Sequence, residues 1–359
     1  MKQFILLLIL AIVLFACSSK SHNDSGGKDY KSASVLKSWN NDSKYDTDTT
    51  ISINTIIKYV EAITDPNSKS FIPVEDRIAV FDMDGTIACE RPFSLELYCS
   101  SQLAFGTTPK CNANGDSLQN AIKKKFGSYL PGNIASDSLI ALFTTYSATL
   151  VNSCIPVNMP SSRILCNQFY KPMIELIKYL KLNEFEVYIV SGSSQQFLWA
   201  ILKNVKPLSK LCPSHIIGSL QKYKKIIHPD GRGPRFYLDT ANFLSNVSQG
   251  KAINIYNRIG KQPVFAFGNT VDDFDMFSIT SSNNKYSTMC VLLNHDSKDI
   301  EDAYLPYKPQ KEVVKNWNQP EYKSNNWSNA IFSNIMRSEG WKIANMSQCF
   351  NRDSVFIGN

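Results

Sequence analysis

The sequence predicts an α/β fold in which a parallel β-sheet is covered by helices on both faces. Short apolar runs, typical of buried strands, recur along the chain, and amphipathic helical segments lie between several of them. Strands that alternate with helices favour a parallel sheet, because each parallel connection crosses over the sheet through a helix. We therefore expect a three-layer, Rossmann-like sheet that binds its ligand at the carboxyl ends of the strands.

The expected strands are short and apolar. In chain order they are Ile78–Phe81, Val187–Val190, Ile216–Ile217, Val264–Phe267 and Cys290–Leu293. Apolar residues that recur every three or four positions predict helices from about Ile53, Met173 and Phe197. Residues 220–244 contain the turn signal Asp230-Gly231 and predict a β-hairpin.

The N-terminal segment predicts export. A lysine and an apolar run precede Leu14-Phe15-Ala16-Cys17, which resembles a bacterial lipoprotein cleavage box with a lipid anchor on Cys17. A plain secretory signal with a chance cysteine is the alternative. We expect residues 1–17 to be a signal peptide and residues 18–38, which are polar and rich in Gly and Ser, to be a flexible tether. The protein would then be a periplasmic or surface lipoprotein of the cell envelope, or else secreted.

The rest of the chain divides into a core and an insertion. We expect the α/β core in residues 39–90 and 169–315, where the strand and helix patterns alternate. Residues 91–168 interrupt that alternation with segments that read as helical or mixed, and they predict a helical cap. Residues 316–359 are expected to form a C-terminal extension that packs on the core.

Composition limits the classes of partner. The chain of 359 residues has a net charge of +7 and scattered basic residues, without a sustained Lys/Arg block. We therefore expect no nucleic-acid partner. A mildly positive protein favours a small anionic substrate.

Two aspartates follow the first expected strand directly. Asp82 and Asp84 lie one residue apart, and Gly85 and Thr86 come next. Carboxylates are rarely buried without a partner, so this position at the end of an apolar strand requires a chemical reason. Gly85 permits the chain to turn at that point.

Three further segments place polar residues at the same expected edge of the sheet. The second strand is followed by Ser191 and Gly192, and the fourth by Gly268-Asn269-Thr270-Val271-Asp272-Asp273. Lys251 precedes that fourth strand. Because the carboxyl ends of parallel strands share one edge, we expect these side chains to meet the two aspartates.

The chemistry of a phosphate monoester accounts for this set of residues. An aspartate can attack phosphorus and form an aspartyl-phosphate, provided that a cation screens its charge. Mg²⁺, which prefers oxygen ligands, provides such screening. A second carboxylate can protonate the leaving oxygen and then activate water. A serine hydroxyl can bind a phosphoryl oxygen, and a lysine adds a fixed positive charge.

The four segments together resemble the haloacid dehalogenase (HAD) superfamily, in its phosphatase branch. The motifs are "DMDGT", "IVSGS", the lysine of "GKAINI" and "FGNTVDDFDM", in that order. A narrower resemblance is to exported hydrolases of the phosphoserine-phosphatase and phosphocholine-phosphatase kind. The tracts "IPVEDRIAVFDMDGTIACERP", "AFGN" and "GWKIANM" carry it.

The resemblance implies a role for each matched residue. Asp82 would be the nucleophile and Asp84 the general acid and base, and Asp84 would also lend its backbone carbonyl to Mg²⁺. Ser191-Gly192 would bind the phosphoryl group, and Lys251 would stabilise its charge. Asp82 and Asp273 would complete the metal site.

One residue departs from the pattern. Most members of the superfamily have an aspartate where this chain has Asn269, whose amide oxygen can ligate Mg²⁺ but brings no charge. Asp272 is the alternative to Asp273 as the carboxylate ligand. Glu90 lies near the position at which related phosphatases bind a substrate amine, and a salt-bridged surface acid is the alternative reading.

The resemblance thus implies a Mg²⁺-dependent phosphomonoesterase for a small monoester of the phosphoserine or phosphocholine type. The alternative is a catalytically weak surface lipoprotein that acts as a binding protein, and Asn269 is the residue that favours it. Asp84 argues against a dehalogenase, because dehalogenases lack the second acid.

Overall fold

The structure is a computed structural model, and it describes the larger part of the chain after the N-terminus. The described residues are 33–90, 94–96, 165–206, 208–227, 233–301, 303–306 and 329–358. The predicted signal peptide, the lipidated Cys17 and nearly all of the predicted cap lie outside these ranges. Those expectations stay predictions.

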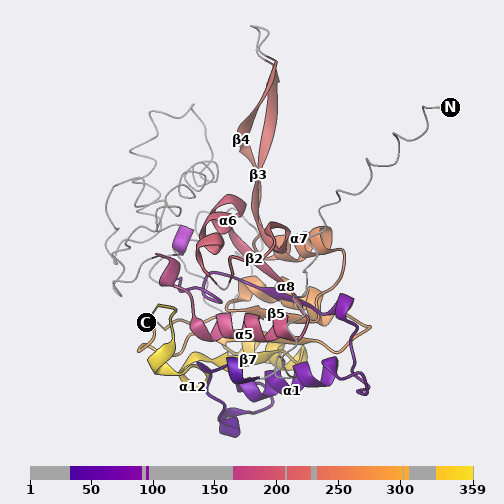
Figure 1. The fold of residues 1–359 in the computed structure, drawn as a ribbon, viewed down its shortest axis with the longest axis vertical. Coiled ribbons are helices and arrows are strands. Elements are labelled where there is room, and N and C mark those ends of the chain that lie inside the picture. Colours follow the sequence, from indigo (N-terminus) through magenta and orange to yellow (C-terminus); the bar gives the residue numbers. More distant parts are fainter. Residues whose placement is uncertain are drawn as a thin grey trace, which may run out of the picture. The chain divides into compact units, whose positions relative to one another are not determined.

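A seven-stranded sheet organises the described residues, in the order β4-β3-β2-β1-β5-β6-β7 (Figure 1). All neighbouring strands are parallel except β3 and β4, which form an antiparallel hairpin. The parallel α/β sheet and the hairpin predicted from the sequence are therefore confirmed. The strands are β1 Ile78–Phe81, β2 Glu186–Ser194, β3 Ile216–Ile227, β4 Pro234–Leu244, β5 Phe265–Gly268, β6 Met289–Asn294 and β7 Lys342–Asn345.

Helices cover both faces of this sheet, as β1 illustrates. Successive side chains of a strand point to opposite faces. Ala79 and Phe81 belong to an apolar cluster with α1, α5 and α6, whereas Ile78 and Val80 belong to a second cluster with α7, α8 and α11. The three-layer architecture follows. The helices are α1 Ile53–Thr64, α5 Lys171–Leu182, α6 Gln195–Asn204, α7 Gln249–Ile259, α8 Phe274–Ser281, α11 Asn329–Ser338 and α12 Met346–Cys349.

Strand β1 lies at the centre of the sheet. Its four residues are all buried, and it pairs with β2 on one side and β5 on the other. Phe81 is in register with Ile189 and with Phe267, so the three strands end close together. The chain segments that leave these strands therefore converge on one edge.

The folded part of the chain begins earlier than expected. Leu36 and Ser38 are buried, and Ser38 donates through its amide and its hydroxyl to the carboxylate of Glu175 on α5 (2.7 and 2.9 Å). Trp39 donates to the carbonyl of Pro172 (2.7 Å). The predicted tether, residues 18–38, is therefore too long at its C-terminal end, because its last residues cover α5.

The C-terminal segment is part of the sheet. Strand β7 pairs with β6 in parallel, from Val291 opposite Lys342 to Asn294 opposite Asn345. Residues 316–359 were expected to pack on the core, and this strand of the segment extends the sheet itself. Its short and half-buried sequence, "KIAN", lacks the apolar run by which the other strands were recognised.

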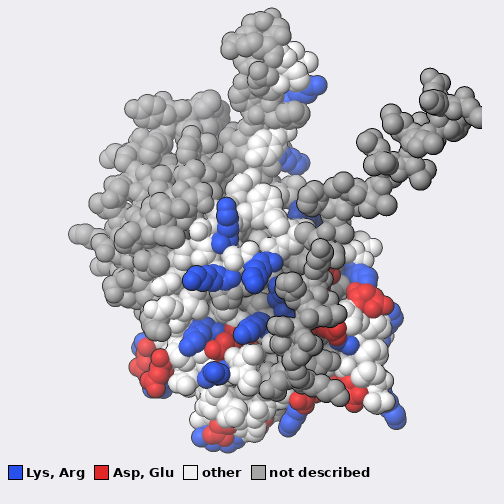
Figure 2. Space-filling model, viewed as in Figure 1, with Lys and Arg blue, Asp and Glu red and all other residues white. Residues whose placement is uncertain are grey.

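Charged side chains form a mixed surface on the face shown in Figure 2. Lys and Arg side chains gather in the middle of that face, with acidic side chains around them. Exposed lysines of the helices include Lys178 and Lys181 of α5 and Lys203 of α6. Partial burial and the like charge of Lys210 lower the pKa of Lys181, so lysines far apart in sequence lie close in space.

Among the described helices, none combines the length and apolarity needed to cross a bilayer.

Removing the side chain of Trp341 tests the structural role of the C-terminal segment. The indole packs edge-on against Phe274 and Phe277, with ring centroids 5.0 and 5.3 Å apart. We expect Trp341→Ala to lower the free energy of unfolding by about 3–5 kcal/mol in urea denaturation, because a large buried side chain leaves a cavity. The control is Trp199→Ala, at a tryptophan that is 42% exposed. It should cost about 1 kcal/mol or less, and equal losses in the two variants would contradict this role.

Candidate active site

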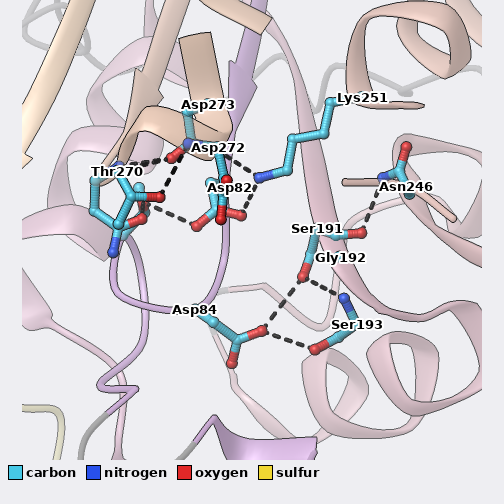
Figure 3. A network of polar contacts seen from close by, with 12 residues as sticks. Asp82, Asp84, Ser191, Gly192, Ser193, Asn246, Lys251, Thr270, Asp272 and Asp273 are labelled. Atoms are coloured by element: carbon cyan, nitrogen blue, oxygen red, sulfur yellow. Dashed lines mark hydrogen bonds and ion pairs between the residues drawn. The ribbon is translucent and has the colours of Figure 1, made fainter. Parts of the chain in front are cut away.

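The candidate site lies where β1, β2 and β5 end. Asp82 follows β1 directly, and its amide donates to the carbonyl of Phe267 on β5 (2.9 Å). Ser191 lies in the last part of β2, and Lys251 lies in the first turn of α7. In Figure 3, Lys251 points toward Asp82, and the side chain of Ser191 points toward Asp84.

Lys251 joins two carboxylates at the centre of the site. Its ammonium lies 2.6 Å from Asp82 Oδ1 and 2.6 Å from Asp273 Oδ1. All three side chains are buried, with exposed fractions of 4%, 5% and 1% for Lys251, Asp82 and Asp273. The three residues belong to α7, the β1 end and the turn after β5, so one buried cation ties three elements together.

Burial and charge act in opposite directions on this triad. Burial alone would lower the pKa of Lys251, but the two carboxylates raise it overall, so the lysine stays charged. Burial raises the pKa of Asp82 well above its ordinary value, despite the neighbouring ammonium, and the charge of Asp273 adds to that rise. The carboxylates outnumber Lys251 in this triad, so the site would gain from a further cation.

Asp84 faces the end of β2 and not the lysine. Its Oδ2 accepts from the hydroxyl of Ser193 (2.7 Å) and lies 3.4 Å from that of Ser191. Burial raises the pKa of Asp84, and the hydrogen bond from Ser193 partly offsets the rise. Asp84 is therefore better suited than an exposed aspartate to carry a proton near neutral pH.

A set of polar residues that the sequence did not single out holds the end of β2. The side-chain amide of Asn246 donates to the carbonyls of Ser191 (2.9 Å) and Ile217 (3.0 Å). The hydroxyl of Ser219 donates to the carbonyl of Gly192 (2.7 Å). These bonds fix the backbone that presents Ser191, whose Oγ accepts from the amide of Ser193 (3.1 Å).

Asp273 also organises the turn after β5. Its Oδ2 accepts from the amides of Asn269 (2.8 Å) and Thr270 (3.2 Å). A Cβ at Gly268 would lie 2.5 Å from the Asp273 carboxylate, so glycine is needed there for this close approach. Asp272 lies on the same turn (Figure 3).

Asn269 has defined partners on both sides of its amide group. Its Nδ2 donates to Glu90 Oε1 (3.1 Å) and to the hydroxyl of Tyr304 (2.7 Å). Its Oδ1 lies 3.4 Å from the hydroxyl of Thr86, which donates to Asp82 Oδ2 (3.1 Å). Tyr304 belongs to no recognisable motif, and it lies 35 positions from Asn269 in the chain.

The turn at Gly85 is held from behind by His295. Gly85 has φ +78°, and its carbonyl lies 2.6 Å from His295 Nε2. The other ring nitrogen of His295 faces Glu301, whose second oxygen accepts from the hydroxyl of Tyr170 (2.6 Å). Burial alone would raise the pKa of Glu301, but His295 lowers it overall. This buried chain of contacts fixes the backbone between Asp84 and Thr86.

Glu96 is a further buried acid that the sequence analysis did not select. Its carboxylate accepts from the amide of Ser194 (2.9 Å) and from the Ser194 hydroxyl, at the N-terminus of α6. Burial raises the pKa of Glu96 to about 7, and the charge of Asp84 contributes. Glu96 thus connects the segment that enters the predicted cap to the end of β2.

The oxygen atoms of the site suit Mg²⁺ chemically. Within the described ranges, no group of three or more His, Cys, Asp and Glu side chains has the arrangement of a metal site. The carboxylates of Asp82 and Asp273, the amide of Asn269 and the backbone carbonyl of Asp84 are nevertheless the hard ligands that Mg²⁺ prefers. The surplus of negative charge favours a cation at this place.

The structure brings the sequence-predicted site residues together at one edge of the sheet, in two groups of contacts. Direct contacts link Asp82, Lys251 and Asp273, and others link Asp84 to Ser191 and Asn269 to Glu90. Gly192 adjoins Ser191 through the backbone. The grouping of the residues is therefore observed, whereas their roles stay predictions.

The chain matches no protein-family profile and no curated protein sequence. Solved structures that are similar include a conserved, functionally unknown protein from Anaerococcus prevotii, with 12% identity, a TM-score of 0.39 and coverage of 70% of this chain and 88% of that one. A phosphoserine phosphohydrolase-like protein from Francisella tularensis has 15% identity, a TM-score of 0.28 and coverage of 67% and 92%. A HAD hydrolase of family IA from Entamoeba histolytica has 13% identity, a TM-score of 0.34 and coverage of 60% and 83%. Because these similarities are low, we infer the chemistry from the residues of the site alone.

Adding a methyl group at Gly85 tests how tightly the turn is packed. A Cβ there would lie 1.9 Å from Asn269 Nδ2 and 2.7 Å from the Tyr304 hydroxyl. We expect Gly85→Ala to lower the free energy of unfolding by about 3 kcal/mol, from overpacking and backbone strain together. Gly260 is a matched control, because it has φ +72° and nothing within 4 Å of the Cβ position. Gly260→Ala should cost about 1 kcal/mol, and equal losses would show that packing at Gly85 is loose.

Glu96 should make stability depend on pH. The pKa of Glu96 is raised from 4.5 to about 7 in the folded protein, so between these values the folded state binds more protons than the unfolded state. Stability from this group is therefore full below pH 4.5 and is lost as the pH rises to 7. Compared with Glu96→Gln, the wild type should lose at most about 3 kcal/mol of unfolding free energy across that window. Parallel stability curves for the two proteins would contradict the raised pKa.

Proposed function

We propose that this protein is a phosphomonoesterase of the HAD superfamily that works through an aspartyl-phosphate on Asp82. The observation that carries the proposal is the triad in which Lys251 lies 2.6 Å from both Asp82 and Asp273. Asp84 follows Asp82 by two residues and accepts a hydrogen bond from the hydroxyl of Ser193. A buried carboxylate beside a fixed cation, next to a second carboxylate of raised pKa, is the arrangement that nucleophilic phosphoryl transfer needs.

In the first step, a carboxylate oxygen of Asp82 bonds to phosphorus while the bond from phosphorus to the leaving oxygen breaks. Lys251 stabilises the anionic form of Asp82, which burial alone would disfavour. The leaving oxygen takes a proton from Asp84, whose raised pKa supports the protonated form. Proton transfer at this moment makes the leaving group a neutral alcohol.

In the second step, the same groups exchange roles. Asp84, now a carboxylate, takes a proton from water, and the water oxygen bonds to phosphorus as the bond from phosphorus to Asp82 breaks. Inorganic phosphate leaves, and both aspartates return to their first state. The hydroxyl of Ser193 donates to Asp84 Oδ2 and keeps the other oxygen oriented for these transfers.

Ser191 and the backbone around Gly192 would bind a phosphoryl oxygen. Ser191 Oγ already lies 3.4 Å from Asp84 Oδ2, so a phosphoryl group bound there is within reach of the proton donor. Asn246 and Ser219 hold this backbone in place. Such fixed donors stabilise charge without having to rearrange during the reaction.

Mg²⁺ is the cofactor that the donor set favours. Asp82, the Asp84 carbonyl, Asn269 and Asp273 or Asp272 would hold it, and when bound it would neutralise negative charge on the phosphoryl group and the nucleophile. For the substrate we propose a small phosphate monoester, of the phosphoserine or phosphocholine type. Export and a lipid anchor on Cys17 also remain proposals from the sequence.

A protein that only binds its ligand is less well supported. Asn269 was the residue that favoured a decayed site, and it is bonded to Glu90, Tyr304 and the Asp273-held turn. In a site that had lost its activity, we would expect the amide of Asn269 to lack hydrogen-bond partners. We therefore regard Asn269 as part of an active site.

Trapping the covalent intermediate tests the proposed function. The full chain is incubated with p-nitrophenyl phosphate and Mg²⁺, quenched in acid and treated with borohydride, which reduces an aspartyl-phosphate to homoserine. We expect homoserine at position 82 by mass spectrometry, and none when EDTA is present. Asp82→Asn should lower kcat by about 10³-fold or more, and Asp84→Asn by about 10²–10⁴-fold.

Controls separate the chemistry from the fold. Each asparagine variant is matched in size to the aspartate that it replaces, and its thermal unfolding is measured beside its activity. Turnover of the wild type without homoserine at position 82 would show direct attack by water. No turnover by folded wild type with Mg²⁺ present would favour a binding protein.

A further inference from the structure

We infer that Glu90 and Tyr304 orient the side chain of Asn269 as a cation ligand, and that Glu90 supplies the negative charge that this position lacks. The inference rests on the proposed function, because it concerns the metal side of the same site. It makes Glu90 a positioning residue that acts through Asn269, and it differs from the substrate-binding role that the sequence predicted for Glu90.

The partners of Asn269 determine which way its amide points. A carboxylate oxygen can only accept, so the group that faces Glu90 Oε1 at 3.1 Å must be the NH₂ group. The Tyr304 hydroxyl accepts from the same nitrogen at 2.7 Å. Both hydrogens of Nδ2 are thereby used, and the carbonyl oxygen is turned to the opposite side.

That opposite side is the Asp82 side of the site. Asn269 Oδ1 lies 3.4 Å from the hydroxyl of Thr86, and this hydroxyl lies 3.1 Å from Asp82 Oδ2. The three oxygens come from two segments, the turn after β1 and the turn after β5, and Lys251 bonds to the other oxygen of Asp82. An amide oxygen that is presented beside a carboxylate oxygen is a typical pair of ligands for a hard cation.

The space around Asn269 is fitted to this orientation. A Cβ at Gly85 would lie 1.9 Å from Asn269 Nδ2, so the turn after Asp84 has to be glycine to admit the amide. Tyr304 is itself fixed, because its ring stacks on His295 with centroids 4.3 Å apart and its amide donates to the His295 carbonyl (3.0 Å). Rotation of the amide by half a turn would set its oxygen against Glu90.

Charge explains why an amide occupies this position. An aspartate at position 269 would place a carboxylate oxygen where Nδ2 lies now, about 3 Å from Glu90 Oε1 and next to Asp82. With asparagine at position 269, the negative charge lies on Glu90, which is behind the amide and accepts a hydrogen bond from it. The site thus keeps the negative charge that attracts a cation, and it avoids repulsion between two adjacent carboxylates.

An exchange of charge between the two positions tests the inference. Mg²⁺ binding to the full chain without substrate is measured by isothermal titration calorimetry for wild type, Glu90→Gln, Asn269→Asp and the double variant Glu90→Gln/Asn269→Asp. We expect Glu90→Gln to weaken Mg²⁺ binding by about tenfold, the scale of losses when an outer partner of a metal ligand is removed. The double variant should recover wild-type affinity within about threefold, since the charge has moved to the ligand itself.

The single variants supply further readouts. Asn269→Asp alone should lower the thermal unfolding temperature of the metal-free protein, because it creates the repelling pair, and Mg²⁺ should restore it. Tyr304→Phe keeps the stacking on His295 and leaves the charge of Glu90 in place, so it should weaken Mg²⁺ binding less than Glu90→Gln does. Thermal unfolding of Glu90→Gln without metal controls for loss of the fold.

Several results would overturn the inference. They are unchanged Mg²⁺ affinity in Glu90→Gln, a loss that the double variant does not recover, and a Glu90→Gln variant that raises only the KM for cationic substrates. The last result would return Glu90 to substrate binding. These outcomes are distinct from failure of the proposed function, because calorimetry measures Mg²⁺ binding whether or not wild type turns over a phosphate ester.

Discussion

The structure of this site depends on one buried ammonium shared between two carboxylates. Lys251 bonds to Asp82 and Asp273, which come from the ends of β1 and β5, and it lies itself on α7. Buried charges without partners cost several kcal/mol each, so none of the three residues is stable there without the others. The same interaction holds the elements together at the sheet edge and offsets part of the rise in the pKa of Asp82 that burial causes. Fold and chemistry are coupled at this point.

A second principle is that the reacting groups are held through the backbone. Asn246 and Ser219 fix the end of β2, His295 fixes the turn at Gly85, and Asp273 fixes the turn after β5. None of these bonds uses the side chain of Asp84 or of Ser191. Preorganisation of this kind lets the donors act on charge as it develops in the reaction, without a cost for rearrangement. It also explains why the site contains more polar residues than the four motifs themselves supply.

The sequence predicted the centre of the fold and of the site because both follow local patterns. Strands such as Ile78–Phe81 are apolar runs, and Asp82 and Ser191 each follow one, so the parallel sheet itself places them together. The rest arises from contacts between distant segments. Strand β7 is short and half-buried, and Glu96 meets Ser194 across 98 positions. Such residues carry no periodic or motif signal, and their partners become apparent only once the chain has folded. Lys181 is a further case, because its like-charged neighbour Lys210 lies far from it in the sequence and close to it only in space.

Asn269 shows how a departure from a motif can be compatible with its chemistry. The site already holds Asp82, Asp84 and Asp273 with Lys251 among them, so burial and mutual repulsion work against each added carboxylate. An amide adds an oxygen ligand without a charge, and its NH₂ group gains two acceptors that a carboxylate could not use. Position 269 lacks a negative charge, and the neighbouring Glu90 supplies one at hydrogen-bond distance. The charges around Asn269 therefore explain why an amide occupies this position. Asn269 has to be interpreted together with Glu90 and not as a single substitution in the motif.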